Sequence, residues 1–148
     1  MNFLLDTNIL IYSLQKKPGV VFGEFILGLK ERGKIFVSAV SRFEVLIGST
    51  DENRGQNTLF LDGFPSHDLT NAIADRAGSL FRFCKRDGIT VDNEDLFIAA
   101  TSFEKGLVLV TTNARHFPLH VSKEKHLVTF KSRRGLDEVK EVHIMEPL

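Results

Sequence analysis

The sequence has a single cysteine, no tryptophan and only four prolines. Cys84 therefore cannot form an internal disulfide, and it has no thiol neighbour at metal-ligand spacing, which fits a reducing compartment. It falls on the apolar stripe of a predicted helix, so we expect it to serve as a small buried hydrophobe.

The sequence also lacks a net charge, because its 19 basic residues balance its 19 acidic ones. The whole molecule has no general electrostatic attraction to nucleic acid, and binding of a polyanion must rest on local patches or bound cations. No apolar run approaches the roughly 20 residues of a spanning helix, so we expect no membrane contact. The first residues have neither the basic start nor the cleavage site of a secretory signal, and we expect a cytoplasmic location.

The 148 residues, 43% of them hydrophobic, suit one globular domain over residues 1–148. Apolar segments alternate with amphipathic ones along most of the chain. We expect strands at 2–5, 34–38, 107–110 and 127–130, and helices at 9–13, 21–32, from 41 onward, at 69–86 and at 93–105. Residues 50–58 fit a loop or a solvated helix start, residues 59–64 suggest a short strand near Phe64, and a charged tail follows Phe130. This alternation predicts an α/β fold with a mostly parallel central sheet covered by helices on both faces.

The site of such a sheet is expected beyond the carboxyl ends of its strands, where Asp6 follows the first strand and Thr111, Thr112 and Asn113 follow the strand at 107–110. Three acidic residues are the candidates for its chemistry. Asp6 directly follows the first apolar strand, and its alternative role is a helix N-cap. Glu44 lies within the third predicted helix, where it also fits a capping box with Ser41. Asp95 opens a helix, where it would otherwise only complement the helix dipole.

If the fold brings these acids together, carboxylates about 4 Å apart repel by about 4 kcal/mol at an effective dielectric near 20. A divalent cation relieves that repulsion, and oxygen ligands without cysteine favour Mg²⁺ or Mn²⁺ over zinc. Such an ion activates water and neutralises charge in phosphoryl displacement. The constellation therefore indicates phosphodiester hydrolysis.

Four segments in this order resemble the PIN domain family, and particularly the VapC-type toxins of type II toxin–antitoxin pairs. They are Leu4–Ile11, Ser41–Gly48, Asp95–Thr101 and Leu109–Phe117, so the resemblance covers about 4–117 and leaves 118–148 as a last strand and tail. It implies a three-layer α/β/α endoribonuclease that uses Mg²⁺ or Mn²⁺ to cleave RNA.

The resemblance also assigns roles to residues and names partners. Asp6 and Asp95 would hold the metal, and Glu44 would position the ion or the attacking water. Three residues would support them: Asn8, Thr111 and Asn113, the last as a hydrogen-bond partner of Asp6 or of a phosphate. A cognate antitoxin protein and a homodimer are implied as well, with an apolar groove for the antitoxin near Phe22, Phe25, Phe60 and Phe64.

One position departs from the family, since many relatives have a fourth acid where this chain has His116. That weakens a second metal site, and His116 is either a phosphate or metal contact or an exposed loop histidine. RNA contact would come from the one dense basic stretch, which also fits an ordinary solvated strand and tail: Lys123, Lys125, Lys131, Arg133 and Arg134.

Three other functions remain open from the sequence. A non-catalytic PIN module that binds RNA or a protein is favoured by the missing fourth acid. A structure-specific DNA nuclease shares the acidic site but is usually longer. A phospho-acceptor receiver domain needs a lysine after a late strand, whereas Ala114 and Arg115 follow the strand that ends in Thr111, Thr112 and Asn113.

Overall fold

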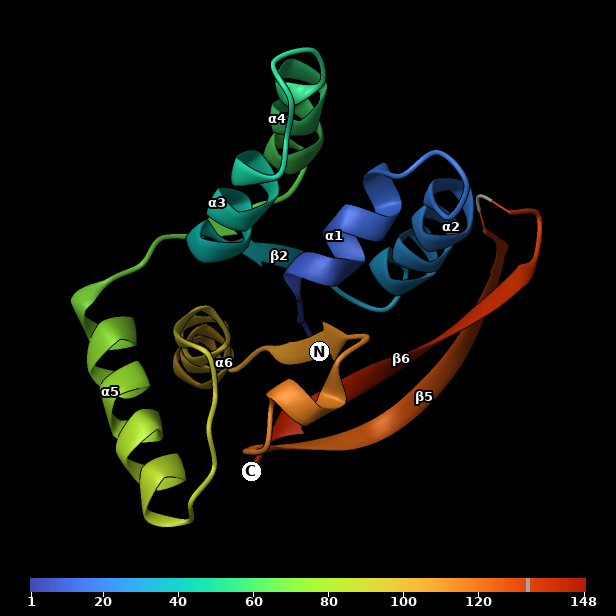
Figure 1. Ribbon diagram of the computed structural model, residues 1–148. Helices are drawn as coiled ribbons and strands as arrows, with labels where there is room; N and C mark the ends of the chain where they lie inside the picture. Colours follow the sequence, from blue (N-terminus) through green and yellow to red (C-terminus); the bar gives the residue numbers. More distant parts are fainter. Residues whose placement is uncertain (133) are drawn as a thin grey trace.

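A six-stranded sheet in the order β3-β2-β1-β4-β6-β5 forms the middle layer of the computed structural model (Figure 1). The structure describes residues 1–132 and 134–148. The strands are β1 (Phe3–Leu5), β2 (Ile35–Ser38), β3 (Ser66–His67), β4 (Val108–Thr111), β5 (His120–Lys131) and β6 (Asp137–Pro147). Strands β3, β2, β1 and β4 pair in parallel, and β6 pairs antiparallel with both β4 and β5. The predicted α/β class with a mostly parallel sheet is confirmed.

The helices connect the strands and cover both faces of the sheet. They are α1 (Thr7–Leu14), α2 (Gly19–Lys30), α3 (Ala39–Ile47), α4 (Arg54–Asp62), α5 (Asn71–Arg86) and α6 (Asn93–Lys105), followed by the short 3₁₀ helix η1 (Ala114–His116). Helix α6 ends at Gly106, whose φ of 61° is a left-handed conformation that glycine adopts without a Cβ penalty. Within the described residues, no helix combines the length and apolar character needed to cross a membrane.

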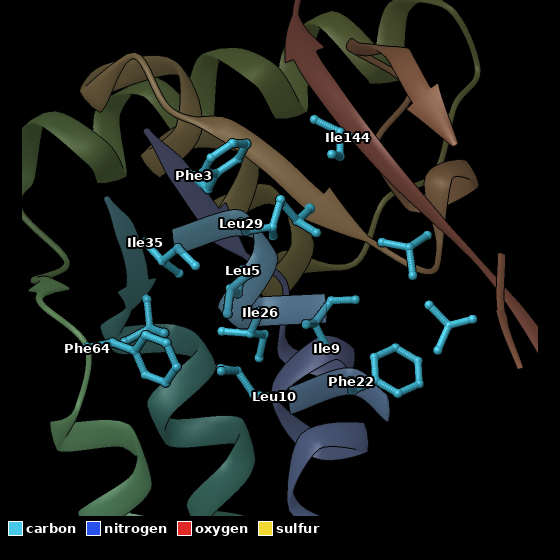
Figure 2. Packing of buried hydrophobic residues seen from close by; sticks show 14 of the residues in the cluster. Phe3, Leu5, Ile9, Leu10, Phe22, Ile26, Leu29, Ile35, Phe64 and Ile144 are labelled. Carbon is cyan, nitrogen blue, oxygen red and sulfur yellow. The ribbon is translucent and has the colours of Figure 1, made fainter. Parts of the chain in front are cut away.

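An apolar cluster lies on each face of the sheet, because successive residues of a strand point to opposite faces. The two clusters pack the helices onto the sheet. Phe3 and Leu5 of β1 point into the first cluster, which includes buried residues of α1, α2 and the β5–β6 hairpin (Figure 2). Leu4, between them, points into the second cluster with residues of α5 and α6. Cys84 is buried in the helix α5, as expected from its place on the apolar stripe.

The predicted start of the third helix at Ser41 is wrong. Ser38 caps α3, and its Oγ accepts a hydrogen bond of 3.0 Å from the backbone N–H of Ser41. The chain passes from strand β2 into helix α3 without a loop, since the extended backbone of Ser38 already serves as the cap. Glu44 is consequently free for a contact other than a capping box.

The prediction for residues 59–64 is also wrong, whereas the solvated helix start at 50–58 is confirmed. Helix α4 runs through Asp62, and β3 forms only at Ser66–His67, paired with the end of β2. The buried side chains of Leu61 and Phe64 lie three residues apart, a spacing that also suits the end of a helix.

The chain after Phe117 contains more strand than predicted. Instead of a strand at 127–130 and a charged tail, β5 and β6 form a long antiparallel hairpin. Exposed residues alternate with the buried Val128 and Phe130, and the charged residues of both strands are exposed or only partly buried. Figure 1 shows this hairpin curving past α2, and the rings of Phe22 and Phe130 lie 6.0 Å apart.

The same packing buries part of the predicted phenylalanine groove. Phe22 is fully buried and Phe64 is 8% exposed, while Phe25 and Phe60 pack against the first cluster. Phe22 and Phe64 therefore belong to the core, whereas Phe25 and Phe60 lie at its edge and keep part of their surface exposed.

Candidate active site

Asp6 lies at the carboxyl end of β1, beside the end of β4. Its backbone N–H donates to the carbonyl of Val110, which continues the pairing of the two parallel strands. Its side chain caps α1, with Oδ1 accepting from the N–H of Thr7 at 2.8 Å. Oδ2 accepts from the hydroxyl of Thr111 at 2.7 Å. Asp6 therefore caps helix α1 and also lies at the edge of the sheet where the site was predicted.

The Asp6 carboxyl group is buried, with 3% of the residue exposed. Burial raises its pKa, the hydrogen bonds from Thr111 and Thr7 oppose that rise, and the nearby charge of Glu44 adds to it. A buried carboxylate without a cation in contact is costly, so this position favours the binding of a positive ion.

Glu44 reaches the same edge from α3 through a chain of hydroxyl groups. Ser38 Oγ lies 3.2 Å from Ser41 Oγ, Ser41 Oγ lies 2.9 Å from Thr7 Oγ1, and Thr7 Oγ1 donates to Glu44 Oε1 at 2.7 Å. Each hydroxyl has one hydrogen, and Thr7 uses its own on Glu44, so Ser41 must donate to Thr7 and Ser38 to Ser41. All donors in this buried chain thus point toward Glu44 and hold its carboxylate.

Asp95 belongs to the first turn of α6, after the N-cap residue Asp92. Burial and the neighbouring charges of Asp6, Glu44 and Asp92 together raise the pKa of Asp95 to about 6, although His116 lowers it. Asp6, Glu44 and Asp95 therefore act on one another electrostatically, although they come from three separate segments of the sequence.

The supporting residues lie around this cluster with different contacts from those predicted. The hydroxyl of Thr111, not the side chain of Asn113, is the partner of Asp6, while the backbone N–H of Asn113 donates to Thr111 Oγ1 at 2.9 Å. Asn8 is half-buried in the first turn of α1, and its side chain makes no hydrogen bond to another described residue.

Sequence reasoning missed the hydroxyl chain and the contact of His116. The nitrogen Nδ1 of His116 lies 3.1 Å from Oδ2 of Asp95. A signal for the chain was present in the positions of Thr7 beside Asp6 and of Ser41 three residues before Glu44. That spacing also fits a capping box, and only the tertiary fold distinguishes the two.

The donor set fits a hard divalent cation by its chemistry, since it consists of carboxylate oxygens, and Asp6 and Glu44 raise the pKa of Asp95. In the part of the chain that the structure describes, no three acidic, histidine or cysteine side chains are close enough to hold an ion as they stand. Asp95 and Glu44 are only partly buried, so the acidic cluster is open to solvent on their side.

An acidic cluster at the carboxyl ends of parallel strands places this chain among the α/β proteins whose functional site lies at that edge of the sheet. The comparisons with known proteins narrow this class. The family model of the PIN domain matches residues 3–119. The tRNA(fMet)-specific endonuclease VapC of Shigella flexneri is 32% identical over 122 residues, which cover 79% of this chain and 90% of the relative.

Further relatives agree with that match. Ribonuclease VapC10 of Mycobacterium tuberculosis is 32% identical over 117 residues, covering 78% of this chain and 86% of the relative. The crystal structure of VapBC2 from Rickettsia felis, bound to a DNA fragment from their promoter, superposes with a TM-score of 0.68 and 25% identity over 78% of this chain and 90% of that chain. The chain belongs to the PIN domain family, among its VapC-type members.

Proposed function

We propose that this protein is a divalent-metal-dependent endoribonuclease and the toxin of a toxin–antitoxin pair. The observation that carries the proposal is the nearness of Asp6, Glu44 and Asp95, since Glu44 raises the pKa of Asp6 and both of these acids raise the pKa of Asp95. Relatives named as ribonucleases support RNA as the substrate, and solved VapBC structures support an antitoxin as the partner.

Asp6 and Asp95 would hold Mg²⁺ or Mn²⁺, and Glu44 would orient the ion or the attacking water. When bound, the ion supplies a polarised phosphate and a more acidic water. Hydrogen bonds within the protein hold two of these side chains in place. Thr111 donates to one oxygen of Asp6, and Thr7 donates to Glu44. Because both threonines are buried, these carboxylates are placed before substrate arrives.

The predicted basic stretch is a weak candidate for the RNA contact. Lys131 lies 2.7 Å from Asp137, Lys125 lies 3.7 Å from Glu141, and Lys123 lies 4.0 Å from Glu146. These acids on β6 offset the charge of the lysines on β5. Arg134 is exposed, and Arg133 lies outside the described residues.

The antitoxin would bind on the exposed face of α3. Phe43 is 58% exposed and Ile47 is 66% exposed, and residues four apart share one face of a helix. Large apolar side chains at this exposure are typical of a surface that a partner covers. Glu44 belongs to the same helix, so a partner seated there would restrict access of RNA to the site.

Residues 1–148 would work as one domain, although the family match ends at 119. The hairpin beyond that point completes the sheet through β6, and its residues Val128, Phe130, Val142 and Ile144 belong to the first apolar cluster.

The homodimer implied by resemblance is part of the same proposal, and light scattering of the purified chain measures it.

The test is cleavage of single-stranded RNA and transfer RNA by the chain freed of antitoxin, with Mg²⁺, with Mn²⁺ and with EDTA. We expect metal-dependent cleavage that is lost in Asp6→Asn and in Asp95→Asn. Asp51→Asn, an exposed acid in the turn before α4, is the matched control and should cleave like the wild type. Absence of cleavage with either metal, or equal cleavage by the two site variants, would support the alternative of a binding module. Cleavage of structured DNA in place of RNA would support the DNA nuclease.

A further inference from the structure

His116, at the end of the 3₁₀ helix η1 after β4, contacts the proposed metal ligand Asp95. Its Nδ1 lies 3.1 Å from Asp95 Oδ2, and the two side chains are 50% and 16% exposed. Among the described residues, it is the one side chain within ion-pair or hydrogen-bond distance of the Asp95 carboxylate. Among the described side chains, His116 is therefore the one that can orient this carboxylate through a hydrogen bond or ion pair.

The backbone that carries His116 is fixed to the rest of the site. The N–H of His116 donates to the carbonyl of Asn113 at 3.0 Å, and Asn113 is bonded through its own N–H to Thr111. Phe117, 1% exposed, anchors the next position in the second apolar cluster. Thr111 also donates to Asp6. The backbone of this short turn is therefore linked to the Asp6 carboxylate, while the ring of His116 contacts the Asp95 carboxylate.

We infer that His116 is a positioning residue, which holds Asp95 through Nδ1 so that the other carboxylate oxygen is available to the metal. The inference rests on the proposed function, because it takes Asp95 as a metal ligand. It requires a hydrogen on Nδ1, which is present both in the neutral Nδ1–H tautomer and in the doubly protonated ring. Groups that orient metal-binding side chains in this way typically change metal affinity by about 10-fold to 100-fold when removed.

Two amide variants separate this role from a direct role of the other ring nitrogen. In His116→Asn the amide nitrogen takes the place of Nδ1, and in His116→Gln it takes the place of Nε2. If His116 acts through Asp95, His116→Asn keeps the function and His116→Gln loses it. A histidine that contacted the metal or the RNA through Nε2 would give the reverse order.

The first measurement is Mn²⁺ binding by calorimetry to the free protein without RNA, for the wild type, His116→Ala, His116→Asn, His116→Gln and Asp95→Asn. We expect His116→Ala and His116→Gln to bind Mn²⁺ about 10-fold more weakly, and His116→Asn to stay close to the wild type. The second measurement is RNA cleavage by His116→Ala as Mn²⁺ is raised. Its rate should return to the wild-type value, because His116 acts through the metal ligand and not on the RNA.

Each other outcome overturns the inference. Equal Mn²⁺ affinity in all His116 variants, while Asp95→Asn binds poorly, would leave the metal site intact and remove His116 from it. Rescue by His116→Gln alone, or a rate of His116→Ala that stays low at saturating Mn²⁺, would assign the histidine a direct contact. Failure of the wild type itself to bind Mn²⁺ would instead refute the proposed metal site, and the inference with it.

Discussion

Replacing His120 by glutamine should remove a large part of the pH dependence of the folding stability. His120 is 6% exposed, and its Nε2 lies 3.1 Å from Ser102 Oγ. Ser102 uses its hydroxyl hydrogen on the carbonyl of Leu107, so the ring must donate from Nε2 and leave Nδ1 without a hydrogen. Nδ1 has no partner in the described structure, and the rings of Phe103 and Phe117 pack edge-on against the imidazole.

Protonation would place a charge and an unpaired N–H in this apolar environment, and burial accordingly lowers the pKa of His120 from 6.5 to about 4. Between these two values the unfolded chain binds a proton that the folded chain does not. The free energy of unfolding therefore falls as the pH falls through this window. For a pKa of 6.5 in the unfolded chain and 4 in the folded one, the loss between pH 7.5 and pH 5 is about 2 kcal/mol.

The assay is urea denaturation of the wild type and His120→Gln at pH 7.5 and pH 5. Glutamine keeps a donor near the position of Nε2 but does not titrate. Raised carboxyl pKa values such as that of Asp95 act with the opposite sign, because they stabilise the fold as the pH falls. Both proteins share that effect, so it cancels in their difference. If wild type and variant lose stability in parallel between the two pH values, the reasoning about His120 is refuted.

Two further predictions concern the proposed site and its partner. Thr7→Val keeps the side-chain shape but leaves Glu44 and Ser41 without their donor and acceptor. We expect it to lower the free energy of unfolding by about 1–3 kcal/mol and the cleavage rate by about 10-fold, with Thr7→Ser close to the wild type in both assays. Ile47→Glu should weaken antitoxin binding by about 10-fold or more in a titration while RNA cleavage is unchanged; equal antitoxin affinity would place the partner elsewhere.

Local sequence patterns were sufficient for most of the fold. The apolar run before Asp6 predicts β1, and the amphipathic period of residues 69–86 and the glycine after Lys105 predict α5 and α6. These signals are local, because the side-chain period and the helix-ending residue depend only on neighbours in the chain. The acids Asp6, Glu44 and Asp95 could be selected in the same way. Asp6 and Glu44 interrupt apolar segments, and Asp95 belongs to a group of acids larger than one helix cap requires.

The tertiary structure decided the features that depend on distant partners. The strands of the β5–β6 hairpin were underestimated because charged residues interrupt their apolar ones. Pairing with β4 and packing on α2 bury the inner face of these strands. Glu44 could not be separated from a capping residue until Thr7, 37 positions away in the sequence, was found beside it. The partner of Asp6 is Thr111, 105 positions away, and the partner of Asp95 is His116. A short sequence motif specifies which groups are present, whereas a hydrogen bond needs two groups within about 3 Å, and that proximity arises only when the strands are assembled.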